Sequence, residues 1–395
     1  MRLLGAGSLG ALVAVATLIA CSPSTAIQEE STPERGEATA GRAVVVIEGG
    51  GGPHPFTTPW RACDGGRADY VQAMLDVGLA VFTAPGYSNV ATSVDGESGC
   101  PPQPPTEVQW NTSGYPTQAG TSVLGFLGFL NQTYGYTTFD LVGYSYGGLV
   151  ARATVGALRS PPTPDSMAPA FSFSQFAVAA GVDIMSIATL NSPHLGAPAY
   201  DVASDPAVFF EPVAAAWGQQ YADAGKLLVP SQRELGAGAI QILETRAHAT
   251  PDPDSWDAQQ VGMLDGVALT LIAGDYCGTT CGDDRAPLDT DASPGSESLR
   301  TDGTVPVYSQ LMLPCPSVCP SPPGSVYLPE GLVPQTGVVR RVFPTAHSTF
   351  ITKPLGLPED VAVSHNVEAM DYLVSVVQAQ WSEAGAPLLP SATSG

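Results

Sequence analysis

The chain has 395 residues, enough to bury a large core within one enlarged domain. It carries 15 Lys and Arg against 37 Asp and Glu, which gives a formal net charge of -22. This balance leaves no broad basic surface to hold a phosphate backbone, so the composition argues against nucleic acid as a partner. We interpret the acidic excess as a contribution to the solubility of an exported protein.

The first 21 residues read MRLLGAGSLGALVAVATLIAC, an apolar stretch that follows Arg2 and ends at Cys21. This pattern resembles a bacterial lipoprotein signal, in which the cysteine becomes acylated. We therefore expect residues 1–21 to be the signal, Cys21 to be the lipid anchor and residues 22–42 to form a flexible tether. The protein would then be exported and anchored to a bacterial membrane or the cell surface, or released. Palmitate labelling that persists in Cys21→Ala would contradict the anchor.

The six remaining cysteines are an even number in a chain expected to enter an oxidising compartment, which favours disulfides. Two pairs have three intervening residues each and lie in Gly- and Pro-rich segments, so local bridges are our hypothesis. Many other connectivities are allowed, and zinc is the rival interpretation, although neither pair encloses a histidine. The hypothetical bridges are Cys63–Cys100, Cys277–Cys281 and Cys315–Cys319.

Short apolar runs alternate with segments of helical spacing along the chain. The expected strands are 43–47, 79–84, 139–142, 184–190, 267–273 and 338–343. The expected helices are 67–77, 121–134, 149–158 and 367–381, and a loop-rich stretch is expected over 88–118. Alternating strands and helices predict an α/β fold, with a mostly parallel central sheet and helices on both faces. The domain is expected to span 43–381, followed by a tail at 382–395.

One segment carries the strongest chemical signal. Residues 139–152 read FDLVGYSYGGLVAR, an apolar strand that leads through Gly143, Ser145 and Gly147 into a helix of small and apolar residues. A serine hydroxyl is a weak nucleophile at neutral pH, and a sharp strand-to-helix turn exposes it beside a base and amide donors. The sequence thus predicts a nucleophile elbow centred on Ser145.

A serine nucleophile needs a base and an acid that orients the base. Asp302 lies in TDGTVP, downstream of the strand that ends near residue 274, and His347 follows the strand 338–343 in FPTAHSTF. The carboxyl ends of parallel strands meet at one edge of a sheet, so these residues and Ser145 are expected there together. Asp275 is an alternative acid and His365 an alternative base.

These motifs resemble those of the α/β-hydrolase superfamily, and within it secreted bacterial lipases and esterases, over most of residues 43–381. The supporting stretches are LVGYSYGGLVAR, TLNSPHLGAP and TDGTVPVYSQ. The resemblance implies Ser145 as nucleophile, Asp302 as acid and His347 as base of an ester hydrolase that acts through an acyl-enzyme. It implies an acyl ester substrate, such as a lipid. No cofactor is expected, and no metal is assigned, because the acidic loop 283–291 could hold calcium but lacks the spacing of an EF-hand.

The resemblance also implies an oxyanion hole made of two backbone amides. Tyr146 follows the nucleophile and supplies one; Gly50, with Gly51 as the alternative, is the expected second donor in the glycine-rich loop after the first strand. The sequence departs from the family pattern at Tyr144 and Tyr146, which replace the more usual His and Gln. It departs again at Glu48, where lipases often carry histidine.

Two further features bear on substrate and function. Residues 197–266 are interpreted as an insertion that forms a lid or a rigid cap over an acyl pocket. TDGTV also resembles the acid loop of lecithin:cholesterol acyltransferase-like enzymes, so acyl transfer is a second hypothesis. A non-catalytic surface binding protein on a hydrolase scaffold is the third.

Overall fold

The computed structural model describes residues 41–50, 69–87, 104, 108–112, 116–160, 181–195, 256–276, 302, 305, 307–313, 328–352 and 357–383. Several expectations lie outside these ranges and stay predictions: the signal, residues 22–40 of the tether, every cysteine, most of the insertion and most of the tail. Gly41 and Arg42, expected at the end of the tether, are instead the first two residues of the strand Gly41–Ile47, and Arg42 is buried. Among the described residues, no helix combines the length and apolar character needed to cross a membrane.

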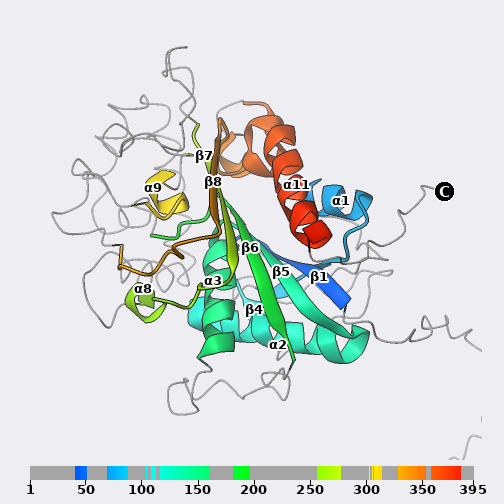
Figure 1. Cartoon of the computed structure of the whole chain (residues 1–395). Helices are drawn as coiled ribbons and strands as arrows, with labels where there is room; N and C mark the ends of the chain where they lie inside the picture. Colours follow the sequence, from blue (N-terminus) through cyan, green and yellow to red (C-terminus); the bar gives the residue numbers. More distant parts are fainter. Residues whose placement is uncertain are drawn as a thin grey trace, which may run out of the picture. The chain divides into compact units, whose positions relative to one another are not determined.

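Six parallel strands form one sheet in the order β2-β1-β5-β6-β7-β8 (Figure 1). Their carboxyl ends therefore share one edge, and every catalytic or oxyanion-hole residue expected from the sequence follows one of these strands. The predicted α/β class with a parallel sheet is confirmed. The strands are Gly41–Ile47 (β1), Val81–Thr83 (β2), Tyr136–Tyr144 (β5), Asp183–Leu190 (β6), Ala268–Gly274 (β7) and Val338–Phe343 (β8).

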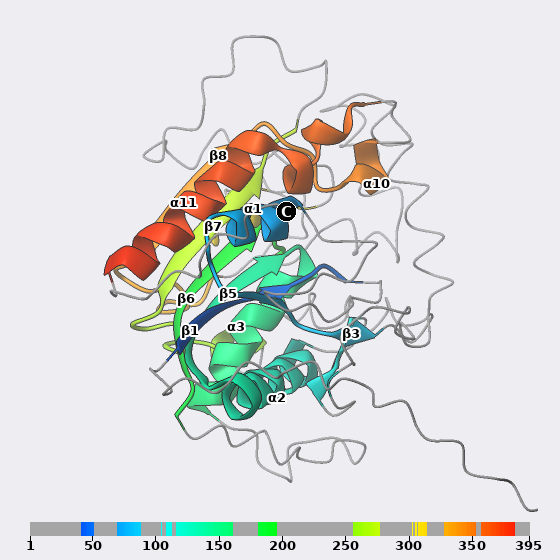
Figure 2. The same ribbon diagram turned by 90° about the vertical axis from the view of Figure 1, so that its right-hand side faces the viewer.

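Helices cover both faces of the sheet. Pro116–Tyr134 (α2) and Tyr146–Arg159 (α3) pack together on one face, and Asp69–Asp76 (α1) and Val367–Glu383 (α11) pack together on the other (Figures 1 and 2). Shorter elements connect them: Trp256–Gln259 (α8), Val307–Gln310 (α9), Thr349–Thr352 (α10) and two 3₁₀ turns, Glu359–Val361 (η4) and Val363–His365 (η5).

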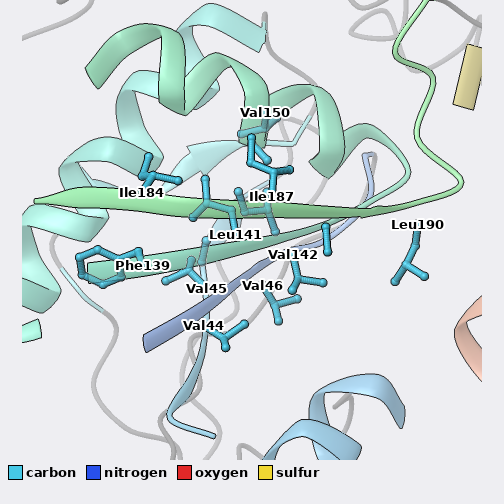
Figure 3. Close-up of a cluster of buried hydrophobic side chains, with 14 of the residues drawn as sticks. Val44, Val45, Val46, Phe139, Leu141, Val142, Val150, Ile184, Ile187 and Leu190 are labelled. Atoms are coloured by element: carbon cyan, nitrogen blue, oxygen red, sulfur yellow. The ribbon is translucent and has the colours of Figure 1, made fainter. Parts of the chain in front are cut away.

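The core lies on both sides of the central strands, because alternate side chains of a strand point to opposite faces. Val45 pairs in register with Leu141, and Leu141 with Ile187, so these three lie on the α3 face, where Val150 meets them (Figure 3). Val44 points to the other face. All five side chains are at most 1 % exposed, which explains why β1, β5 and β6 read as nearly continuous apolar runs.

The stretch expected to be loop-rich, 88–118, and the residues just before it contain additional structure. Gly86–Tyr87 (β3) and Trp110–Asn111 (β4) pair as a separate two-stranded parallel sheet. Trp110 is fully buried and its indole N–H donates to the carbonyl of Ala84 at 3.3 Å. Helix α2 also begins earlier than expected, at Pro116, because proline is well suited to the first turn of a helix.

Candidate active site

Ser145 occupies the sharp turn between β5 and α3. Its backbone has φ 51° and ψ -123°, a strained conformation for a residue with a side chain and the one expected of a nucleophile elbow. The flanking glycines allow the close packing that the turn requires. A Cβ on Gly143 would lie 2.5 Å from Cα of Gly148, and one on Gly147 would lie 2.6 Å from the carbonyl oxygen of Glu48. Larger residues at either position would force the turn apart.

The three side chains singled out from the sequence meet at the carboxyl edge of the sheet. Ser145 Oγ lies 2.8 Å from Nε2 of His347, and Nδ1 of His347 lies 2.7 Å from Oδ2 of Asp302. With the ring proton on Nδ1, the imidazole donates to the carboxylate and accepts from the serine hydroxyl. Asp302 is fully buried and His347 is 7 % exposed, so the chain of hydrogen bonds is screened from water except at its serine end.

The carboxylate of Asp302 is held from several sides. Its second oxygen accepts the N–H of Val305 at 2.7 Å, and its backbone carbonyl accepts the N–H of His347 at 2.8 Å. The side chain of Gln310 donates to the carbonyl of Val305 at 2.7 Å and accepts the N–H of Gly274 at 2.8 Å. These bonds join the acid-bearing segment to the end of β7, so the direction of the carboxylate is set by the fold.

The loop after β1 approaches the serine closely. A Cβ on Gly49 would lie only 3.3 Å from Cβ of Ser145, which shows how near this backbone comes to the nucleophile. Gly50, the expected oxyanion donor, follows in an exposed bend. Tyr146, the other expected donor, is the first residue of α3, at the positive end of the helix dipole. Gly51, the alternative donor, lies outside the described residues.

Glu48 begins this glycine loop and carries an acidic group that sequence reasoning noted only as a departure from the family pattern. The hydroxyl of Tyr70, on α1, donates to Oε2 of Glu48 at 2.7 Å. Although the residue as a whole is half-buried, burial of its carboxyl raises the pKa of Glu48 above its usual value, and the Tyr70 hydrogen bond opposes that rise. Burial, then the charge of Glu48, raises the pKa of Tyr70 well above its ordinary value.

The alternative residues have different surroundings. Asp275 follows β7, and its backbone N–H donates to the carbonyl of Phe343 at 2.8 Å, whereas the carboxylate 2.7 Å from the imidazole is that of Asp302. His365 lies in η5, where its Nδ1 is 2.8 Å from the hydroxyl of Ser364. The geometry therefore favours the Asp302–His347 pair over both alternatives.

A buried cluster beside the elbow helix was not foreseen from the sequence. Arg152 on α3 is fully buried. Its guanidinium donates to the carbonyl of His194 at 3.0 Å and to Oδ1 of Asp257 at 2.7 Å. Its Cζ atom lies 4.7 Å from the ring centre of Trp256. Arg152 joins α3 to the segment after β6 and to α8. The one sequence feature that could have indicated this cluster is an arginine within the apolar helix that follows the elbow.

Among the described residues, no group of three or more His, Cys, Asp or Glu side chains is arranged to hold a metal ion. The chain has the α/β-hydrolase fold. Its features are the strand order, the elbow and the Ser–His–Asp arrangement at the carboxyl edge of the sheet.

The chain is similar in part to known proteins. Residues 120–206, which include the elbow, match the family model described as "Putative serine esterase (DUF676)". No curated protein sequence matches the chain. Solved structures that are similar include lipase 1 from Pelosinus fermentans, with 13% identity, 86% of this chain and 98% of that chain covered and a TM-score of 0.42. EstA from Clostridium botulinum has 14% identity, covers 88% of each chain and has a TM-score of 0.41.

Proposed function

We propose that the protein is a serine hydrolase that cleaves carboxylic esters through an acyl-enzyme, with Ser145 as nucleophile, His347 as base and Asp302 as acid. The observation that carries the proposal is the continuous chain of short hydrogen bonds from Asp302 through His347 to Ser145. It ends at a serine whose backbone is strained to φ 51°. Strain of this kind persists where the surrounding structure maintains it, and it clusters at active sites.

All the proton transfers of the proposed reaction pass through His347. As Ser145 Oγ attacks the ester carbonyl, its proton passes to Nε2 of His347, 2.8 Å away. The carboxylate of Asp302 stabilises the resulting imidazolium through Nδ1. The imidazolium then gives its proton to the departing alcohol, which leaves the acyl group on the serine. In the second half, His347 takes a proton from water, the hydroxide attacks the acyl-enzyme, and Ser145 recovers its proton as the acid leaves.

Negative charge develops on the carbonyl oxygen during both attacks. We assign its stabilisation to the backbone amides of Tyr146 and Gly50. The nearness of the β1 loop to Ser145 and the position of Tyr146 at the start of α3 support this assignment. In known hydrolases one such donor contributes about 3 kcal/mol to catalysis.

The sequence supports the finer parts of the proposal. An apolar acyl chain is the proposed substrate group, and residues 197–266, which include several aromatic side chains, are the proposed lid or cap over it. Acylation of Cys21 is the proposed means of retention at the bacterial surface.

The first test is hydrolysis of p-nitrophenyl butyrate and p-nitrophenyl palmitate by the purified protein. Ser145→Ala should lower kcat by about 10⁴-fold or more, because it removes the nucleophile. Ser375→Ala is the matched control, since Ser375 is exposed on α11 and its hydroxyl donates only along that helix, to Tyr372. The ratio of the two wild-type rates reports acyl-chain preference.

Folded wild-type protein that hydrolyses neither ester and does not react with a fluorophosphonate would contradict the proposal and favour the binding protein. Product analysis in the presence of an added long-chain alcohol separates the other alternative. Free acid as the main product supports hydrolysis, and ester of the added alcohol as the main product identifies an acyltransferase.

A further inference from the structure

The hydroxyl of Tyr144 makes a contact that the proposed mechanism does not use. Tyr144 is the last residue of β5 and the immediate neighbour of Ser145. Its hydroxyl donates to the backbone carbonyl oxygen of His347 at 2.6 Å, across 203 positions of the chain. The phenol and imidazole ring centres are 5.8 Å apart with an angle of 31° between their planes. One side chain on the nucleophile's strand thus contacts both the main chain and the ring of the base.

The other bonds to this part of the β8 loop come from different directions. The N–H of His347 donates to the carbonyl of Asp302 at 2.8 Å, on the acid's side. The neighbouring Ala346 exchanges backbone bonds with Val361 and Val363, on the segment that precedes α11. Neither of these sets comes from the strand that carries the serine. A longer bond, from Nδ2 of Asn191 to the carbonyl of Ala346 at 3.4 Å, comes from the end of β6. The Tyr144 bond does come from the serine's strand, because Tyr144 and Ser145 are joined by one peptide bond.

The ring of Tyr144 is itself held in place. A Cβ on Gly49 would lie 3.4 Å from Cδ1 of Tyr144, so the β1 loop packs against one part of the ring, and His347 lies against another. The hydroxyl proton is directed at a carbonyl oxygen, so the phenol is not set to donate to a substrate. This arrangement favours a role in holding the base over a direct role in the chemistry.

We propose that Tyr144 is a positioning residue that keeps Nε2 of His347 within hydrogen-bonding distance of Ser145 Oγ through its bond to the His347 carbonyl. The inference rests on the proposed function, because it assigns Tyr144 a task in the same proton transfer. Proton transfer is sensitive to placement: a displacement of about 1 Å can cost on the order of 100-fold in rate.

Tyr144→Phe tests the inference, because phenylalanine keeps the ring contacts and removes only the hydroxyl. We expect kcat for p-nitrophenyl butyrate to fall by about 10- to 100-fold, with KM changed by less than about twofold. The rate of fluorophosphonate labelling should fall by a similar factor, because labelling needs Ser145 and His347 but no ester. Tyr136→Phe is the matched control, since Tyr136 is the first residue of the same strand and packs edge-on against Phe82.

Each outcome has a defined meaning. Equal kcat and labelling rates per folded molecule in wild type and Tyr144→Phe would overturn the inference, and so would an effect confined to KM, which would place the hydroxyl in substrate binding. An equal loss in Tyr136→Phe would also overturn it, because the loss would then not be specific to the hydroxyl that bonds to His347. None of these results affects the proposed function, which fails only if wild-type protein lacks Ser145-dependent hydrolysis.

Discussion

Glu48 places an acidic group at the start of the loop that reaches the nucleophile. Its carboxyl accepts the Tyr70 hydroxyl at 2.7 Å, and burial raises the pKa of Glu48 above the ordinary value of 4.5. The folded protein therefore holds the Glu48 proton more tightly than the unfolded chain does. As pH rises from about 4.5 through the raised pKa, the unfolded chain loses its proton first, and the free energy of unfolding falls.

Replacement of this carboxyl by an amide removes that pH dependence. Glu48→Gln cannot ionise, and its side-chain oxygen can still accept the Tyr70 hydroxyl. We expect it to unfold with a larger free energy than wild type at neutral pH, and the gain should shrink to nothing as pH falls toward 4.5. Urea denaturation at a series of pH values measures this, with Glu368→Gln on the exposed face of α11 as control. A gain in stability that is the same at every pH would show that ionisation of Glu48 is not its cause.

Helix α2 shows how one element uses glycine in two different ways. A Cβ on Gly120 would lie 2.5 Å from the backbone carbon of Ala153, so Gly120 is a point of close approach between α2 and α3. A Cβ on Gly125 would lie 3.6 Å from Cγ1 of Val108, an ordinary contact distance. Glycine inside a helix destabilises it relative to alanine, so Gly125 weakens α2 without a packing requirement.

The two positions should respond to alanine with opposite signs. Gly125→Ala should raise the free energy of unfolding by about 0.5–1 kcal/mol through helix propensity. Gly120→Ala should lower it by about 1–3 kcal/mol, because α3 must move away. Guanidinium denaturation of both variants measures the difference, and each serves as the control for the other. A loss at both positions would mean that a methyl group at position 125 costs more in packing than it adds in helix propensity.

The elements that could be predicted from the sequence are those with local signals. Short, mainly apolar runs marked the central strands, and glycine spacing around Ser145 marked the elbow. Strands β3 and β4 were missed because two residues each carry no periodicity. The three proposed catalytic residues were found because each lies in a short motif after a strand. Two hydrogen bonds could not be predicted from the sequence, because each joins segments that meet only in the folded chain. They are the bond from Tyr144 to His347 and the bond from Tyr70 to Glu48.

At the scale of the whole molecule, one buried carboxylate joins four elements at a distance from the site. Asp140 on β5 accepts two bonds from Arg42 of β1 at 2.7 Å each, one from Ser186 of β6 at 2.5 Å and one from Trp381 of α11 at 2.7 Å. Arg42 also donates to the carbonyl of Gln380 at 2.9 Å. The first strand and the last helix, which are far apart in sequence, are thereby joined through the centre of the sheet.

Removal of this carboxylate should lower the stability of the protein and leave catalysis by the folded molecules unchanged. Asp140→Ala leaves the buried Arg42 without its partner and should lower the free energy of unfolding by about 3–5 kcal/mol. Ser186→Ala removes one neutral donor and should cost about 1 kcal/mol. Asp140 precedes Ser145 by five residues, about 16 Å along an extended strand, so kcat per folded molecule should stay at the wild-type value in both variants. Urea denaturation and active-site labelling on the same samples separate the two quantities. Equal losses of stability in the two variants would show that Arg42 forms another interaction when Asp140 is removed. A fall in kcat per folded molecule would show that the network also stabilises the conformation of the elbow.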